Sequence, residues 1–401
     1  MLDRLLVLAC AAAPAPGADP IRVRRVDGSS ARYSGIALDA RSGATLTPTE
    51  GGVVTVPFAE LVEVEFPARL ARPATLPGTT VILHDGSRLV GDPRGGDREH
   101  LRIAIAGGGE LEIPVDVIRA LFAGPRHATL DVARFAGVGA GDSLHRRPEV
   151  GGDYTRGTLE EFSAGGVRFE YTLGTTSFPW SEVEAVVLAM QVPIEAPAPP
   201  VVVADLRPDG ILRGTLVRLT PQELVLLPPG FAAPVALPRE EVDALRFEGE
   251  RHLWLSSRAP ARVRQVPFLG PEEQFLFPWR PDRSVTGGPL LVRGRRFGSG
   301  FGCHSRTTLQ FDLGGEWSRF EAEVGVSDEV TLLPDHGAIE FRVLVDGQEK
   351  WRSGVVRGGE PPVAVGPIAV SGARSLELVT DFGAGEDVAD RGVWGSPHLL
   401  R

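Results

Sequence analysis

The side chains best suited to chemistry lie in the last third of the chain, and the chemistry that they suggest is sugar binding. A pyranose needs an aromatic face for the apolar side of its ring and a few acidic, basic or imidazole groups for its hydroxyls. The ligand-binding candidates are therefore three tryptophans and three polar residues: Trp279, Asp282, His304, Trp351, Asp390 and Trp394. For each tryptophan the alternative is packing in a hydrophobic core, and for His304 it is a partly buried ring bonded to a backbone carbonyl.

An acidic loop over residues 381–390 could supply oxygen ligands to a structural Ca²⁺ ion, because hard cations prefer carboxylates. The candidate ligands are Asp381, Glu386 and Asp387. The spacing of these residues differs from that of an EF-hand loop, and the alternative is a solvated acidic loop. We expect no cofactor other than this structural ion.

The sequence lacks the common catalytic motifs. It contains no H-E-x-x-H, no paired-cysteine metal spacing, no G-x-S-x-G elbow and no P-loop. A glycosidase needs two carboxylates about 5 to 9.5 Å apart, and the 52 acidic residues leave that option open. We expect a protein that is not an enzyme, with a catalytic or accessory role in glycoside hydrolysis as an alternative.

Four segments of the first 250 residues share one pattern. Each opens on an aspartate turn and closes on a proline followed at +4 and +7 by apolar residues; the prolines are Pro57, Pro114, Pro179 and Pro238. Short alternating runs between these marks are typical of strands, and a proline at the first position of one helical turn would lead into a closing strand. We therefore predict small SH3-like or Sm-like barrels as β units at residues 19–70, 75–125, 126–190 and 201–250, with a Pro-rich linker at 191–200.

Longer strands are expected after residue 250. Residues 306–313, 319–326, 338–345 and 375–380 alternate between apolar and polar side chains, and an Asp-Gly pair at 346–347 is typical of a hairpin turn. This pattern predicts a jelly-roll β-sandwich over residues 253–401. The whole chain is thus expected to be all-β.

Five blocks of the predicted sandwich carry a resemblance to a known family. They are GFGCHS at 300–305, FDLGG at 311–315, FEAEVGVSD at 320–328, FRVLVDG at 341–347 and DRGVW at 390–394. In this order they resemble the NPCBM domain, a module that accompanies family 98 glycosyl hydrolases and is similar to galactose-binding β-sandwiches. The resemblance covers residues 255–401 and implies a carbohydrate ligand of the galactose type. Where a family member has histidine after the last aspartate, this chain has Arg391.

Charge and the N-terminal residues indicate where the protein acts. A net charge of −10 argues against a nucleic-acid partner, because such proteins concentrate positive charge. No apolar run approaches the roughly 20 residues that a transmembrane helix needs. Residues 1–18 resemble a signal peptide, with lipidation of Cys10 as an alternative to its removal. We therefore expect a secreted, periplasmic or cell-surface protein.

The leading hypothesis is a binding protein in which the sandwich holds a glycan and the β units form a spacer or a partner-binding stalk, with envelope proteins as further partners. The alternative is a structural or assembly protein whose sandwich contacts other proteins. An exposed aromatic side chain in a concave patch would favour the first, and an extended apolar face would favour the second.

Overall fold

The computed structural model describes residues 20–67, 78–105, 109–124, 135, 141–189, 193–270 and 277–401. It is built almost entirely of strands, which confirms the all-β prediction. The predicted signal peptide and Cys10 lie outside the described residues. None of the helical segments in the described ranges has the length and apolarity that a membrane-spanning helix requires.

The N-terminal part contains four β units of five antiparallel strands each. In every unit the first strand pairs with the second and the fifth, and the second, third and fourth follow in order, which is the arrangement of a small SH3-like barrel. Unit 1 contains β1 (Ile21–Arg25), β2 (Ser30–Asp39), β3 (Gly43–Pro48), β4 (Val54–Val56) and β5 (Leu61–Glu65). Unit 2 contains β6 (Thr79–Leu83), β7 (Arg88–Gly96), β8 (His100–Ile105), β9 (Glu110–Pro114) and β10 (Ile118–Phe122). Unit 3 contains β11 (Asp142–Arg146), β12 (Tyr154–Ser163), β13 (Gly166–Tyr171), β14 (Gly174–Pro179) and β15 (Val183–Val187). Unit 4 contains β16 (Val201–Leu206), β17 (Gly210–Leu219), β18 (Glu223–Leu227), β19 (Val235–Pro238) and β20 (Val242–Phe247).

The turn before the closing strand follows the proline, as predicted. The proline, however, directly precedes this turn, whereas it was expected to be the first residue of the turn. Pro57, Pro114 and Pro238 have extended backbones and precede the single 3-10 turns η1 (Phe58–Glu60), η2 (Val115–Val117) and η5 (Arg239–Glu241). In units 2 and 4 the proline is also the last residue of β9 or β19. The fixed φ of proline suits an extended residue as well as a helical one, so the spacing alone left the position open.

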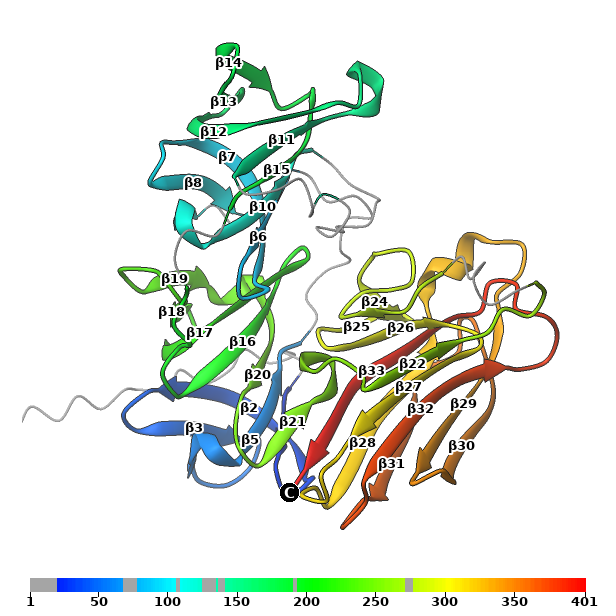
Figure 1. The fold of residues 1–401 in the computed structure, drawn as a ribbon. Helices are drawn as coiled ribbons and strands as arrows, with labels where there is room; N and C mark the ends of the chain where they lie inside the picture. The colour runs from blue at the N-terminus through cyan, green and yellow to red at the C-terminus, as the bar shows by residue number, and fades with distance from the viewer. Residues whose placement is uncertain are drawn as a thin grey trace, which may run out of the picture.

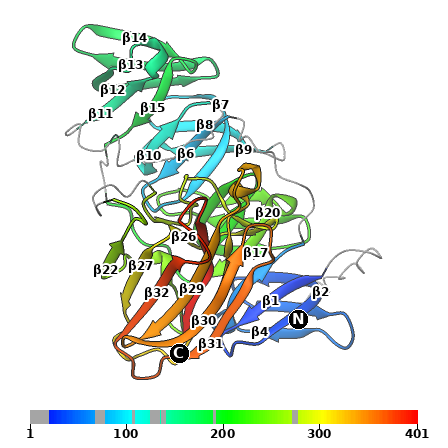
Figure 2. The ribbon, with the colours of Figure 1, turned by 90° about the vertical axis from the view of Figure 1, so that its right-hand side faces the viewer.

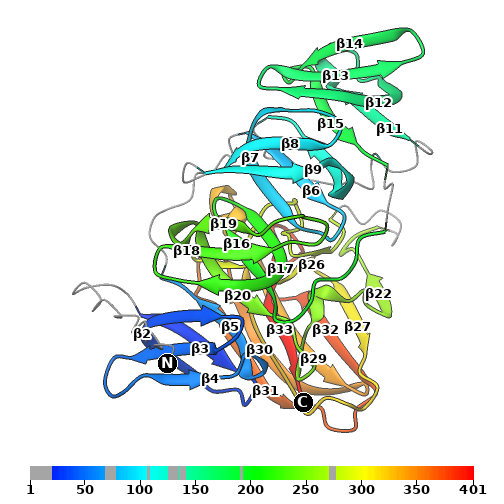
Figure 3. The same cartoon turned by 90° about the vertical axis from the view of Figure 1, so that its left-hand side faces the viewer.

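The four units associate in two pairs, unit 1 with unit 4 and unit 2 with unit 3, and both pairs use the same two contacts. The closing strands run antiparallel, β5 beside β20 and β10 beside β15. The ends of the second strands also meet, β2 with β17 and β7 with β12. A bridge between β17 and β7 then joins unit 4 to unit 2. Figure 3 shows the resulting stack in the order 3, 2, 4, 1, which differs from the order in the sequence.

The C-terminal part is a two-sheet sandwich that lies beside units 1 and 4 (Figures 1 and 2). One sheet has the order β23-β26-β33-β28-β31, with β21 added along β33, and the other has the order β22-β27-β32-β29-β30. The first sheet contains β21 (His252–Trp254), β23 (Arg280–Pro281), β26 (Gly300–His304), β28 (Arg319–Val326), β31 (Val363–Ala369) and β33 (Arg391–Leu400). The second contains β22 (Arg262–Gln265), β27 (Thr307–Asp312), β29 (Ala338–Val345), β30 (Gln348–Arg357) and β32 (Ser375–Phe382). A hairpin of β24 (Leu290–Val292) and β25 (Arg295–Phe297) extends from the sandwich.

The strands of the sandwich form because their alternation buries one face. Every second residue of β29, from Ile339 to Val345, points into the core that the two sheets enclose. The predicted strands at 319–326 and 338–345 coincide with β28 and β29. Burial of these apolar faces, at about 25 cal/mol per Å² of apolar surface, is the main force that holds the two sheets together.

Buried ion pairs connect the sandwich to the β units. Asp209, in the turn before β17, is 1% exposed and accepts hydrogen bonds from Arg283 at 2.5 Å and Arg296 at 2.8 Å, both from the sandwich. Arg88 of unit 2 also contacts it, at 3.4 Å. Burial alone would raise the pKa of Asp209, but the three guanidinium groups outweigh it and hold that pKa well below its usual range. This aspartate, which turn chemistry alone seemed to explain, therefore joins three parts of the molecule.

Candidate functional site

Trp394 belongs to the core, so its selection as a ligand-binding residue is wrong. It lies on β33, between β26 and β28, and is fully buried. Its indole Nε1 donates a hydrogen bond to Thr380 Oγ1 at 3.0 Å, and the ring of Phe341 meets it edge-on at 5.4 Å. With both its polar group and its faces occupied inside the sandwich, this ring has no surface to offer a sugar.

The other two candidate tryptophans lie apart from each other. Trp279 precedes β23 in the first sheet and packs edge-on against Phe301 at 6.0 Å. Trp351 lies on β30, at the edge of the second sheet, opposite Val343. Both are partly buried against the core of the sandwich. The structure therefore does not unite them in one aromatic platform.

Asp282 shapes a turn. Its backbone has a positive φ of 53°, its Oδ1 accepts a hydrogen bond from the amide of Gly300 at 2.9 Å, and its own amide donates to the carbonyl of Gly300 at 2.8 Å. It also borders a cavity of about 550 Å³ between unit 4 and the sandwich, together with Arg213 and Glu248. Asp282 is hydrogen-bonded to Gly300 at the start of β26, whereas His304 is the last residue of that strand. The two candidate residues therefore lie at opposite ends of β26.

His304 and Asp390 come together at one end of the sandwich, where β26 ends and β33 begins. Asp390 is 1% exposed; its Oδ2 accepts a hydrogen bond from Ser305 Oγ at 2.6 Å and its Oδ1 accepts one from the amide of Ala338 at 2.8 Å. His304 lies 2.9 Å from the Ser305 carbonyl through Nδ1. Since a carbonyl only accepts, Nδ1 carries the proton. Asp390 thus ties two loops together and holds the segment that carries His304.

Burial shifts the pKa values of both groups. Burial raises the pKa of Asp390 to about 6, against the hydrogen bonds from Ser305 and Ala338, which favour the charged form. Burial also lowers the pKa of His304, despite its hydrogen bond to the Ser305 carbonyl and the nearby Asp387. At neutral pH the imidazole is therefore uncharged and has its acceptor lone pair on Nε2.

Two residues outside the predicted set complete this end of the sandwich. The ring of Phe277 stacks on His304, with ring centres 4.9 Å apart and planes 18° apart, and the guanidinium of Arg391 lies 5.8 Å from the centre of the Phe277 ring. Arg391 also lies 3.8 Å from Glu329. Only the resemblance had drawn attention to Arg391, as a departure from the family pattern, and no motif marks Phe277.

The acidic loop does not gather its candidate ligands into a metal site. Asp381 is buried and forms ion pairs with Arg306 and Arg342. Asp387 accepts a hydrogen bond from the amide of Phe268 at 3.1 Å, and Glu386 is exposed. Within the described ranges, no three His, Cys, Asp or Glu side chains are grouped so that they could hold a metal ion. The selection of these three residues as a calcium site is therefore wrong, because guanidinium groups already neutralise the buried carboxylate.

Apolar side chains reach solvent beside His304. Phe268 is 40% exposed and meets Phe382 edge-on at 5.3 Å, and Leu269 and Val388 are more exposed still. We call Phe268, Phe277, His304, Asp387 and Arg391 the His304 edge. An aromatic surface with imidazole, guanidinium and carboxylate groups next to it can stack on the apolar face of a sugar and bond its hydroxyls.

Comparison with known proteins finds relatives of this chain both by sequence and by structure. An alpha-1,3-galactosidase B of Akkermansia muciniphila is 30% identical over 105 residues, which are 25% of this chain and 13% of that enzyme. The CBM51 module of a Clostridium perfringens GH95 protein, solved with methyl-galactose, is 22% identical and covers 37% of this chain and 99% of that chain, with a TM-score of 0.32. Tandem CBM51 modules of a family 98 glycoside hydrolase from Streptococcus pneumoniae are 11% identical and cover 95% of this chain and 88% of that chain, with a TM-score of 0.32. The NPCBM/NEW2 domain family matches residues 260–400, so this part of the chain is an NPCBM/NEW2 domain.

Proposed function

We propose that the protein binds a glycan of the galactose type at the His304 edge, without itself catalysing a reaction. The observation that carries this proposal is the stack of Phe277 on His304 beside Arg391. Similarity to part of an alpha-1,3-galactosidase supports the galactose-type ligand. The short span of that similarity, 13% of the enzyme, fits a binding module better than a catalytic domain.

Each group of the His304 edge has a distinct role in this proposal. Phe268 and Phe277 cover the apolar face of the sugar ring. The neutral imidazole of His304 accepts a hydroxyl hydrogen at Nε2, and the guanidinium of Arg391 donates to ring or hydroxyl oxygens. Asp390 touches no ligand and acts as a positioning residue, because both its oxygens bond to the protein.

The β units serve in this proposal as a rigid base. Three arginines converge on Asp209 from unit 2 and the sandwich, so the sandwich that carries the His304 edge is held against units 2 and 4. We also propose that the protein acts outside the cytoplasm, at the cell surface or in the periplasm, where glycans of this type are met.

A glycan array with the full chain tests the ligand class. The proposal predicts that glycans with terminal galactose or N-acetylgalactosamine bind, and that a Phe277→Ala variant with an unchanged unfolding transition does not bind them. Binding of other classes only would reject the galactose-type ligand. Failure of the folded protein to bind any glycan would favour the structural or assembly role.

A further inference from the structure

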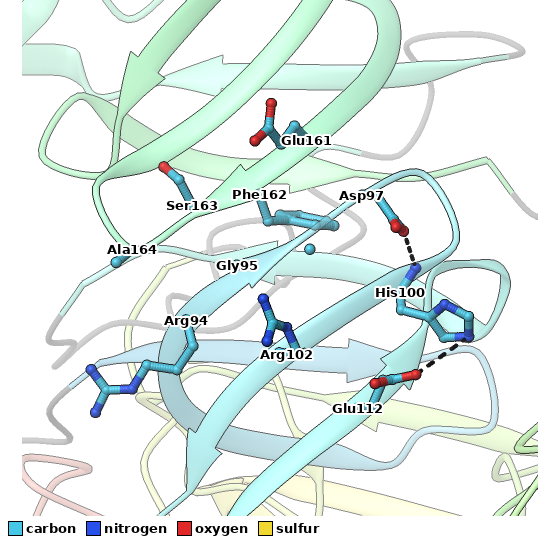
Figure 4. Close-up of a pocket in the computed structure, with 11 residues that line it drawn as sticks. Arg94, Gly95, Asp97, His100, Arg102, Glu112, Glu161, Phe162, Ser163 and Ala164 are labelled. Atoms are coloured by element: carbon cyan, nitrogen blue, oxygen red, sulfur yellow. Dashed lines mark hydrogen bonds and ion pairs between the residues drawn. The ribbon is translucent and has the colours of Figure 1, made fainter.

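A groove of about 620 Å³ lies where unit 2 meets unit 3, far from the sandwich (Figures 1 and 4). Here the end of β7 pairs with the end of β12, with Gly96 opposite Phe162 and Gly95 opposite Ser163. At the corresponding junction between units 1 and 4, Leu38 takes the place of Gly96 and pairs with Leu219. Gly95 and Gly96 both line the groove, where they contribute no side chain.

Backbone geometry requires glycine at one of these positions. A Cβ atom on Gly96 would lie 2.2 Å from the carbonyl oxygen of His100, which no packing adjustment around a side chain could relieve. The φ angle of Gly96 is 154°, a conformation that L side chains rarely adopt, so both backbone strain and close approach exclude a side chain. The close pairing of β7 with β8 therefore requires one of the glycines that line the groove.

The charged groups that line the groove fall into two sets. Its carboxylates already have partners: Glu161 pairs with Arg168 at 3.1 Å, Glu112 lies 3.8 Å from His100, and Asp97 accepts the amides of Glu99 and His100. The two arginines of the lining, unlike these carboxylates, have side chains without partners in the part of the chain that the structure describes. Among the described residues, the side chains of Arg94 and Arg102 have no hydrogen-bond or ion-pair partner, and both side chains are exposed. Figure 4 shows the Arg102 guanidinium below Gly95 in the middle of the lining residues, and the Arg94 side chain at their left edge.

We propose that this groove is a second ligand site, which binds a saccharide carrying carboxylate or sulfate groups. Arg94 and Arg102 bind the acidic groups, since a planar guanidinium matches the geometry of either anion with two parallel hydrogen bonds. The second oxygens of Glu112 and Glu161 accept hydroxyl hydrogens. The site does not depend on the glycan site at the His304 edge, because no residue is shared.

The lining of the groove favours a saccharide over an acidic peptide. A peptide would bind by adding a strand to a free sheet edge or by placing an apolar anchor in a pocket. The strand ends at this junction already pair with each other, and Phe162, the aromatic residue of the lining, is 1% exposed. What remains is a polar surface with paired carboxylates and unpaired guanidinium groups, which suits a polyhydroxylated anion.

The test is calorimetric titration of the full chain with three probes: a galacturonate tetrasaccharide, a chondroitin sulfate tetrasaccharide and a hexaglutamate peptide. The proposal predicts that at least one acidic tetrasaccharide binds, and the two saccharides show whether carboxylate or sulfate is preferred. An R94Q/R102Q double variant should bind at least about tenfold more weakly, since it loses the hydrogen bonds that both guanidinium groups make to the acidic groups. Raising the salt from about 50 to about 300 mM should weaken binding as well.

The matched control is Arg156→Gln, an exposed arginine at the other end of β12 that does not line the groove. Its affinity should equal that of the wild type, and Phe277→Ala should also leave binding at the groove unchanged. Three results would overturn the proposal: no binding of either acidic saccharide, equal loss in the R156Q control, or tighter binding of hexaglutamate than of both saccharides.

Discussion

Arg283 of the sandwich and Asp209 of unit 4 form a buried ion pair with a nitrogen–oxygen distance of 2.5 Å. Two more arginines, Arg88 and Arg296, contact the same carboxylate. Four charged groups that share one buried position stabilise the junction only as a set, because removal of one leaves the others buried without compensation. This cluster of ion pairs links the sandwich to units 2 and 4.

The first prediction concerns this junction. Asp209→Asn removes the buried negative charge that three guanidinium groups share, and it should lower the free energy of unfolding by about 3–5 kcal/mol. Asp153→Asn is the matched control, because Asp153 occupies the corresponding turn of unit 3 and is exposed. It should change stability by less than about 0.5 kcal/mol. Urea denaturation measures both, and equal small effects would show that the junction does not depend on Asp209.

A second prediction tests whether Trp394 belongs to the hydrophobic core or to the glycan-binding site. Trp394→Phe removes the hydrogen bond to Thr380 and part of the ring, so the folded protein should be about 1–3 kcal/mol less stable. Its affinity for the glycan should stay within about twofold of the wild type, since the ring is fully buried. Thermal unfolding and calorimetric titration measure the two quantities. Loss of affinity without loss of stability would place Trp394 in the site after all.

Asp390 provides a pH prediction. Its pKa is raised from 3.8 to about 6 in the folded protein, so folding favours the protonated form. The contribution of Asp390 to stability is therefore complete below pH 3.8, declines as the pH rises through about 6, and is constant above that. The difference in unfolding free energy between wild type and Asp390→Asn should change across this window and be flat outside it. A difference that is constant from pH 4 to 7 would contradict the raised pKa.

His304 makes glycan binding depend on pH in the opposite direction. Because burial lowers the pKa of His304 below its ordinary value of 6.5, the ring is neutral at pH 7, the form that the proposed site needs to accept a hydroxyl hydrogen. Protonation at lower pH removes that acceptor, so affinity should fall as the pH drops through the lowered pKa. His304→Gln keeps an acceptor and should bind with little dependence on pH. A wild-type profile with the same shape as that of the variant would remove His304 from the site.

The sequence predicted more of the fold than of the candidate site. Alternation predicted β28 and β29 to the residue, because one face of each strand is buried and the other is not. The proline spacing predicted the turn before each closing strand. These are local patterns, and they reflect which face of a single element meets the core.

The candidate site depends on contacts between segments far apart in the chain, which local patterns do not contain. Trp394 and Trp351 look equally suited to stacking on a sugar in the sequence, yet the sandwich encloses the first and leaves the second at an edge strand. Asp209 looks like any other turn aspartate until three distant arginines converge on it. Phe277 becomes a candidate only because the fold places its ring against His304.

The measurement that tests the central claim most directly is calorimetric titration of Phe277→Ala and Arg391→Ala with the glycan that the array identifies. A Tyr154→Ala variant serves as the control, because Tyr154 is an aromatic residue of unit 3 that is 52% exposed. The account predicts that the first two variants keep the unfolding transition of the wild type but bind at least about tenfold more weakly, as loss of an aromatic contact or of a hydrogen bond to a charged group implies. The control should bind as the wild type does. Wild-type affinity in both Phe277→Ala and Arg391→Ala would contradict the account and place the glycan elsewhere on the protein.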